Sequence, residues 1–263
     1  MNNRFKTVFD KNPLIGMVHL LPLPGSPSYA GSITAIMQAA VEDMLALQKG
    51  GADAFIIENF GDVPYEGEIT REALAVMAAV CAQLSKESSL PFGINVQFND
   101  IDSEWALALA SAADFIRVEA FVENRIGIHG ISYACAPRLM RLKAAYPAKA
   151  MIFADINVKH TFPLAPQPIE FSVHEAIESG ADALIVTGLL TGQNPTIEDV
   201  QQVKEMAGGT PVIIGSGINA KNAAQYLAVS DGVIVGSSLK FDGDVNKRVD
   251  AERVAGLVES LHQ

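Results

Sequence analysis

The sequence predicts an α/β protein in which eight parallel strands alternate with helices and close into a single barrel. Three observations support this prediction: short apolar runs alternate with helix-period segments, a motif recurs at every second unit, and the two sets of loops differ in length. The 263 residues fit one such domain, because barrels of this kind use roughly 250 residues.

Eight short apolar runs, rich in β-branched and aromatic residues, predict strands that are buried on both faces, as in a parallel sheet. The runs are residues 14–18, 54–57, 92–96, 115–118, 150–153, 183–186, 212–214 and 233–235. Helix-period segments separate them, for example 33–47, 73–84, 132–145, 197–207 and 248–261. Eight strand–helix units in this length predict a (β/α)8 barrel of the TIM type, preceded by a short N-terminal arm at residues 1–12.

A short motif precedes every second predicted strand. Its copies are Gly51-Ala52-Asp53-Ala54, Ala112-Ala113-Asp114-Phe115, Gly180-Ala181-Asp182-Ala183 and, more weakly, Ser230-Asp231-Gly232. The intervening strands begin differently, after a proline in most cases. A two-unit period is expected for a barrel that is built from repeated βαβα quarters.

The loops fall into two classes, and the division locates the functional face. Helix-to-strand connections are tight, whereas strand-to-helix connections are long and polar, at 19–32, 58–69, 119–131, 155–169 and 187–196. In a TIM-type barrel the long loops that follow the strands build the active face. A doubly wound nucleotide-binding sheet is disfavoured, because no Gly-rich fingerprint follows the first predicted strand.

Composition excludes several classes of function. The chain carries 19 Lys and Arg against 30 Asp and Glu, a net charge of −11, which disfavours nonspecific binding to nucleic acid or to an anionic membrane surface. No apolar stretch approaches the ~20 residues of a membrane span, and no secretory signal opens the sequence. Cys81 and Cys135 lack metal-site spacing and are expected as buried thiols. We therefore expect a soluble, cytoplasmic protein.

Two Gly/Ser loops near the end of the chain form the clearest candidate for a binding site. They follow the seventh and eighth predicted strands and comprise Gly215, Ser216, Gly217, Gly236, Ser237 and Ser238. Converging backbone N–H groups at helix N-termini bind phosphate, and barrels often bind it between these two loops. The alternative is a pair of ordinary tight turns.

Two residues near these loops have predicted roles of their own. Asn219 is expected to cap the helix that follows the seventh strand. Lys240 is expected to be a solvated surface lysine, with a cation of the anion site as the alternative.

A second polar cluster follows the fifth predicted strand, in the run Asp155-Ile156-Asn157-Val158-Lys159-His160. Alternation along an extended chain places Asp155 and Asn157 on one side, toward the barrel mouth, with Lys159 and His160 on the loop above. A carboxylate beside a lysine and a histidine can serve acid–base chemistry, hold a divalent ion or bind an anion. A structural ion pair at the loop rim is the alternative.

Other strands end on single polar residues, which together predict an active-site ring. His19 follows the first strand, Glu58 the second, and Arg117 and Glu119 flank Val118 on the fourth. Charged side chains inside a barrel need each other, a metal or a ligand, because unpaired buried charge is costly. In this ring Glu58, Glu119 and Asp155 supply negative charge, His19 is a neutral base or ligand, and Asp155, His19 and Glu58 are the candidate metal ligands.

Four of these segments resemble the BtpA family, which is named for a protein linked to photosystem I biogenesis. They are Gly16-Met17-Val18-His19-Leu20-Leu21-Pro22-Leu23-Pro24-Gly25, Glu58-Asn59-Phe60-Gly61-Asp62, Arg117-Val118-Glu119 and the run from Asp155 to His160. The resemblance covers nearly the whole chain. It implies a TIM-type barrel in a cytoplasmic or membrane-peripheral location, with no settled biochemical activity.

Two functions from different classes fit the sequence. The first is an enzyme that acts on a small phosphorylated metabolite, with a sugar phosphate as the leading substrate, by isomerase, epimerase or lyase chemistry. Its phosphate would bind the Gly/Ser loops, a divalent metal is an option, and the catalytic residues would be Asp155, Glu119, Glu58, His19 and Lys159. The second is a noncatalytic assembly or regulatory factor that binds its partner through the apolar loops 20–32 and 161–169. The same loops suit self-association, and we expect a homo-oligomer.

Overall fold

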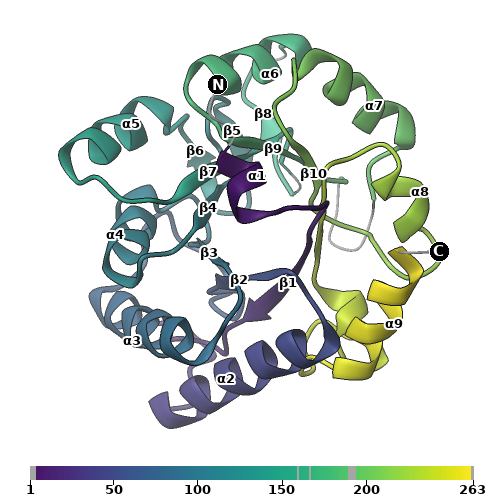
Figure 1. The fold of residues 1–263 in the computed structure, drawn as a ribbon. Coiled ribbons are helices and arrows are strands. Elements are labelled where there is room, and N and C mark those ends of the chain that lie inside the picture. Colours follow the sequence, from purple (N-terminus) through teal and green to yellow (C-terminus); the bar gives the residue numbers. More distant parts are fainter. Residues whose placement is uncertain (1–3, 159, 166, 189–193, 262–263) are drawn as a thin grey trace.

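The computed structural model describes residues 4–158, 160–165, 167–188 and 194–261. Eight parallel strands close into a barrel in the order β1-β11-β10-β9-β7-β4-β3-β2 (Figure 1). They are β1 (Leu14–His19), β2 (Ala54–Glu58), β3 (Phe92–Asn95), β4 (Phe115–Val118), β7 (Met151–Ile156), β9 (Ala183–Val186), β10 (Val212–Ile214) and β11 (Val233–Val235). Each corresponds to one predicted strand, and the predicted TIM-type barrel is confirmed.

One helix follows each barrel strand and packs around the outside of the barrel (Figure 1). The helices are α2 (Ile33–Gly50), α3 (Arg71–Glu87), α4 (Ile101–Ser111), α5 (Ala136–Ala145), α6 (Ile169–Glu178), α7 (Ile197–Met206), α8 (Ala223–Leu227) and α9 (Ala251–Leu261). Two 3-10 turns, η1 (Ser237–Leu239) and η2 (Phe241–Gly243), separate β11 from α9. Among the described residues, no helix is both long and apolar enough to cross a bilayer.

Two predicted helix starts are wrong. The helix predicted from residue 132 begins at Ala136, because Ser132 is the last residue of a strand of a second sheet. Asn219 does not cap α8, since its side-chain oxygen accepts a hydrogen bond from the Lys221 N–H inside a turn. The N-cap position of α8 is occupied by Asn222.

The repeated aspartate of the sequence motif joins neighbouring strands near their starts. Each aspartate accepts a hydrogen bond from a backbone N–H of the preceding strand and donates its own N–H to the carbonyl of that same residue. The pairs, with side-chain distances, are Asp53 with Leu14 (2.9 Å), Asp114 with Phe92 (3.1 Å), Asp182 with Ile152 (2.8 Å) and Asp231 with Val212 (2.7 Å). The two-unit repeat therefore marks four similarly bonded strand pairs.

The predicted N-terminal arm contains a short helix, α1 (Arg4–Val8), which closes one end of the barrel. In Figure 1 this helix lies over the centre of the ring of strands. Its Phe5 ring centroid is 5.8 Å from that of Phe153, and the Phe9 centroid is 6.2 Å from that of Phe115. We call this end of the barrel the floor.

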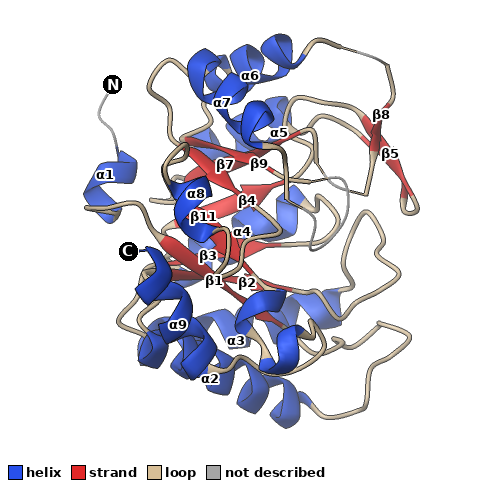
Figure 2. Ribbon diagram, turned by 90° about the vertical axis from the view of Figure 1, so that its right-hand side faces the viewer, coloured by secondary structure: helices blue, strands red, loops and turns tan. Residues whose placement is uncertain are grey.

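The opposite end, the mouth, carries a small antiparallel sheet that the sequence did not predict (Figure 2). Its strand order is β6-β5-β8, with β5 (Arg125–Gly127), β6 (Gly130–Ser132) and β8 (Phe162–Pro163). Arg125 holds the base of this sheet, because its buried guanidinium pairs with Glu123 and donates to Thr161 and to Asn157.

Candidate active site at the barrel mouth

The inward-facing positions of the strands change from apolar to polar between the floor and the mouth. The apolar inner cluster includes Met17 on β1, Ile56 on β2, Phe115 on β4 and Phe153 on β7. Two residues further along, where alternation returns the side chain to the interior, the same strands carry His19, Glu58, Arg117 and Asp155. Strand register places His19 beside Glu58, and Glu58 beside Asn95. The predicted ring of polar strand ends is therefore assembled at the mouth.

Asp155 is bound to Arg117 in a buried ion pair. The Arg117 Nε lies 3.0 Å from Asp155 Oδ1, and the Arg117 Nη2 lies 2.9 Å from Asp155 Oδ2. The two side chains are 3% and 0% exposed. Bidentate pairing fixes the plane of the guanidinium. This geometry indicates that Asp155 positions Arg117, and the partner of Arg117 is Asp155 rather than the neighbouring Glu119.

Two amide side chains connect the other two carboxylates of the ring. Asn95 donates to Glu119 Oε1 at 2.8 Å. Gln97 donates to Asn95 Oδ1 at 3.1 Å and to Glu58 Oε1 at 3.2 Å. The Gln97 backbone N–H is itself held by Asn59, at 2.7 Å. One oxygen of Glu58 and one of Glu119 are thereby fixed by the same chain of amides.

Glu119 is the ring carboxyl whose ionisation the fold changes most clearly. It is 3% exposed, and its Oε2 has no hydrogen-bond partner among the described residues. Burial raises the pKa of Glu119 to about 8; Arg117 opposes this rise, and the negative charges of Asp155 and Glu58 add to it. A carboxyl with a pKa near the operating pH is suited to proton transfer.

Both predicted Gly/Ser loops open into one small cavity at the mouth, of about 40 Å³. Its lining brings five of the six predicted phosphate-binding residues together with three members of the ring: Gly215, Ser216, Gly217, Gly236, Ser237, His19, Glu58 and Arg117. The hydroxyl of Ser238, the sixth, instead donates to the Ile218 carbonyl at 2.6 Å. Gly217 has a φ of +77°, and a Cβ there would lie 2.3 Å from the backbone nitrogen of Asn194, so this turn requires glycine.

Asn157 and His160, from the predicted Asp155-to-His160 cluster, lie away from the ring. Asn157 adopts a left-handed backbone with a φ of 55°, which ends the strand alternation, and its side chain accepts a hydrogen bond from Arg125 at 3.0 Å. His160 is exposed on the following turn. Lys159 lies outside the described residues. In the part of the chain that is described, no group of three or more His, Cys, Asp or Glu side chains is placed to hold a metal ion.

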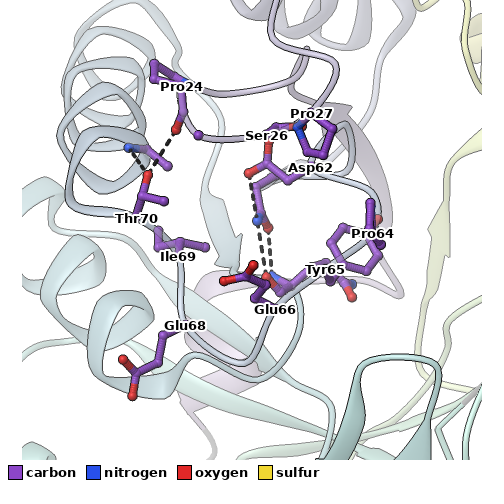
Figure 3. Close-up of a pocket in the computed structure, with 14 residues that line it drawn as sticks. Pro24, Ser26, Pro27, Asp62, Pro64, Tyr65, Glu66, Glu68, Ile69 and Thr70 are labelled. Carbon is purple, nitrogen blue, oxygen red and sulfur yellow. Dashed lines mark hydrogen bonds between the residues drawn. The ribbon is translucent and has the colours of Figure 1, made fainter.

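An acidic cavity of about 140 Å³ lies between the loops that follow β1 and β2 (Figure 3). Asp62 and Glu66 point into it from opposite sides, while Glu68 lies apart at its edge (Figure 3). Asp62 accepts hydrogen bonds from the Leu23 N–H at 2.7 Å and from Asn59 at 3.2 Å. Burial raises the pKa of Asp62. This cavity contacts the mouth through Asn59 and Gln97, which also line it.

A basic cavity of about 290 Å³ also adjoins the mouth, next to His19 and Phe60. Lys240, Lys247 and Arg248 line it. Lys240 was expected at the surface, and this prediction is wrong: the residue is 1% exposed, because η1 and η2 turn it inward toward Asp43. Sequence reasoning missed Lys247 and Arg248, although adjacent cations after the last strand are a detectable signal in so acidic a chain.

Comparisons with solved structures agree with the barrel architecture. Thiamine phosphate pyrophosphorylase from Pyrococcus furiosus is 17% identical, with a TM-score of 0.60 over 95% of each chain. N-(5'-phosphoribosyl)anthranilate isomerase from the same organism is 14% identical, with a TM-score of 0.57 over 95% of this chain and 99% of that one. At these identities the likeness shows the fold alone.

Relatives of similar length share much more sequence. An uncharacterized protein of Pyrococcus abyssi is 40% identical over 253 residues, which cover 95% of this chain and 96% of the relative. The photosystem I biogenesis protein BtpA of Synechocystis is 37% identical over 259 residues, 98% of this chain and 90% of the relative. The model of the BtpA family matches residues 10–263. The chain therefore belongs to the BtpA family.

Proposed function

We propose that this protein is an enzyme that binds a small phosphorylated metabolite at the barrel mouth and transfers a proton on it. One observation carries the proposal: a single cavity is lined by both Gly/Ser loops, by the Arg117 guanidinium and by Glu58 and His19. An anion-binding surface beside acid–base groups is what proton transfer on a phosphorylated substrate needs. The two solved structures named above carry phosphorylated compounds in their names, which agrees with this substrate class.

Each residue of the mouth has a role in this proposal. Backbone N–H groups of the Gly/Ser loops bind the phosphate, and Arg117, oriented by Asp155, adds a cation. Glu58, which lines the cavity, takes a proton from a carbon next to a carbonyl or hydroxyl, and His19 beside it donates a proton to the product. Transfer of the proton from Glu58 to His19 then restores both groups. Glu119 is linked to Glu58 by Asn95 and Gln97 and keeps a second proton available near neutral pH. Lys159 stays a predicted catalytic residue.

This chemistry favours an isomerase, epimerase or lyase, because such reactions need an acid and a base but no redox cofactor. A sugar phosphate is the simplest substrate that offers both a phosphate and an acidic carbon. A divalent metal stays an option.

The anion site is tested with Ser237→Asp, which places a carboxylate in the second Gly/Ser loop. Ser237 is partly exposed at the start of η1, so the variant is expected to fold. Inorganic phosphate and ribose 5-phosphate should raise the melting temperature of the wild type and of Ser237→Ala, but not that of Ser237→Asp. Equal stabilisation of all three proteins would show that phosphate does not bind at these loops.

The second candidate function, a noncatalytic assembly factor, is favoured by one surface. Ile131, Ile126 and Phe162 stand in register across the small sheet at the mouth, and they are 46%, 42% and 72% exposed. An exposed apolar row of this kind suits a protein partner or a second copy of the chain. Glu119→Gln discriminates the two functions in cells that carry only this variant. If the protein is an enzyme, such cells should show the phenotype of a deletion; if it is an assembly factor, they should behave like the wild type.

A further inference from the structure

The basic cavity beside the mouth concentrates positive charge in an acidic protein. Lys240, Lys247 and Arg248 line it, and no Asp or Glu appears in its described lining. The remaining lining side chains are mainly apolar or small, including Leu20, Leu21 and Pro22. In a chain with a net charge of −11, acidic side chains outnumber basic ones. Three basic side chains around one cavity therefore require an explanation.

The carboxylates that pair with these cations do not line the cavity, and the buried ones are too few. Lys240 and Arg248 share Asp43: the Lys240 Nζ lies 3.6 Å from Asp43 Oδ2, and the Arg248 Nη2 lies 3.1 Å from Asp43 Oδ1. Lys240 and Asp43 are both 1% exposed. The other two carboxylates that pair with these cations are exposed to solvent. Glu42 lies 4.0 Å from the Arg248 Nε and is 55% exposed. Asp242 pairs with Lys247 and is 78% exposed. The one fully buried carboxylate of the cluster, Asp43, is therefore shared by two cations, Lys240 and the 32% exposed Arg248.

Hydrogen bonding is also incomplete in this cluster. The Nε and Nη2 atoms of Arg248 are buried, yet neither has a hydrogen-bond partner among the described residues. Asp43 Oδ1 is engaged by the backbone N–H of Val249 at 2.7 Å, which limits what it can offer to Arg248. Burial lowers the pKa of Lys240, and the nearby Arg248 adds to this effect while Asp43 opposes it. An additional negative charge in the cavity would stabilise both cations.

The position of the cavity connects it with the proposed active site. His19, Phe60 and Val245 line both the basic cavity and the small cavity of the Gly/Ser loops. The Phe60 ring stacks on His19, with ring centroids 4.2 Å apart, so this pair lies where the two cavities adjoin. The acidic cavity of Figure 3 contacts the mouth through other residues and would repel an anion.

We infer that the basic cavity binds a second anionic group of the substrate, a carboxylate or a second phosphoryl group. The inference rests on the proposed function and narrows its substrate class to small phosphorylated metabolites with an anionic group at each end. The two sites bind in different ways. Backbone N–H groups of the Gly/Ser loops hold the first phosphate, while the side chains of Arg248, Lys247 and Lys240 hold the second anion.

Lys247→Met tests the site with little risk to folding, because the Lys247 side chain is 47% exposed and pairs with a solvated aspartate. Arg248→Gln is the second variant, and Lys86→Met, at the exposed end of α3, is the charge-matched control. Calorimetric titration compares three ligands on similar six-carbon skeletons: glucose 6-phosphate with one anionic group, 6-phosphogluconate with a phosphate and a carboxylate, and glucose 1,6-bisphosphate with two phosphates.

We expect at least one of the two-anion ligands to bind the wild type and Lys86→Met about tenfold more tightly than glucose 6-phosphate does, the gain from one added charge-assisted contact. Lys247→Met and Arg248→Gln should each lose most of that gain and retain glucose 6-phosphate binding. Preference for 6-phosphogluconate would identify the second group as a carboxylate, and preference for the bisphosphate would identify it as a phosphoryl group.

The inference is overturned if neither two-anion ligand binds more tightly than glucose 6-phosphate, or if the gain survives in both cavity variants. A separate result bears on the proposed function: Ser237→Asp should abolish glucose 6-phosphate binding. If Ser237→Asp abolishes glucose 6-phosphate binding but Lys247→Met does not change the affinity of the two-anion ligands, the second site is rejected and the proposed function is not. Crystals soaked in inorganic phosphate give a readout that is independent of ligand size, with density expected beside Arg248 as well as at the Gly/Ser loops.

Discussion

At the scale of single residues, Glu119 couples the stability of the fold to pH. Its pKa is raised by burial from 4.5 to about 8, so the folded state holds a proton that the unfolded chain has already released over that range. The stabilising effect of this proton is complete below about pH 4.5 and is lost as the pH rises through about 8.

Glu119→Gln should remove that loss. We expect the melting temperature of the wild type to fall by about 5 °C more than that of Glu119→Gln between pH 5 and pH 8. Glu205→Gln, an exposed change on α7, is the control and should follow the wild type. Parallel curves for the wild type and Glu119→Gln, measured by thermal melting in matched buffers, would contradict the assignment of a raised pKa to this residue.

The Arg117–Asp155 pair leads to a prediction about stability. Asp155→Ala leaves a buried guanidinium without its partner, and we expect it to lower the free energy of unfolding by about 3–5 kcal/mol in a urea titration. Replacing both partners with apolar residues, in Arg117→Met/Asp155→Leu, should recover most of the loss. If the double variant is less stable than Asp155→Ala, the two side chains stabilise the fold through contacts other than their attraction for each other.

The sequence identified which residues reach the mouth better than it identified how they pair. Strand alternation correctly placed Arg117 and Asp155 inside the barrel, but the partner of Arg117 depends on the neighbouring strand β7 and cannot be obtained from spacing along one strand. Lys240 was misplaced for a related reason, since its burial depends on Asp43, which lies far away in the sequence on α2.

At the scale of elements, the repeated aspartates couple each βαβ quarter through two hydrogen bonds. Asp182→Ala removes the bond from the Ile152 N–H and should lower the free energy of unfolding by about 1–2 kcal/mol. Asp182→Asn keeps an acceptor oxygen and should cost less than half as much. Equal losses in the two variants, measured by urea denaturation, would show that the negative charge rather than the hydrogen bond matters.

The strands of the barrel could be predicted from the sequence, whereas helix α1 and the small sheet at the mouth could not. All eight barrel strands have a strong apolar signal because they are buried on both faces. Strands β5, β6 and β8 are two or three residues long, and they depend on contacts between separate loops, such as the hydrogen bond from Arg125 to Thr161. Helix α1 has only five residues, which is too short for a periodic pattern, so its sequence indicated no more than an arm.

At the scale of the whole molecule, the floor and the mouth are at opposite ends of the barrel (Figure 2). Phe5 is 5% exposed and packs against Phe153, so Phe5→Ala should lower the free energy of unfolding by about 3 kcal/mol. Phosphate binding at the mouth should not change. Phe171→Ala, at a position on α6 that is 53% exposed, is the matched control, with an expected change within about 0.5 kcal/mol. A loss of phosphate binding in Phe5→Ala would show that the two ends are coupled.

The location of α1 also constrains how the protein is made on the ribosome. Phe5 and Phe9 leave the exit tunnel well before their packing partners, because Phe153 and Phe115 belong to β7 and β4, which are synthesised later. The nascent chain must therefore carry two unshielded aromatic rings until β4 and β7 have emerged. Docking of α1 is consequently later than the synthesis of β7, and until it occurs these two rings offer chaperones an apolar target.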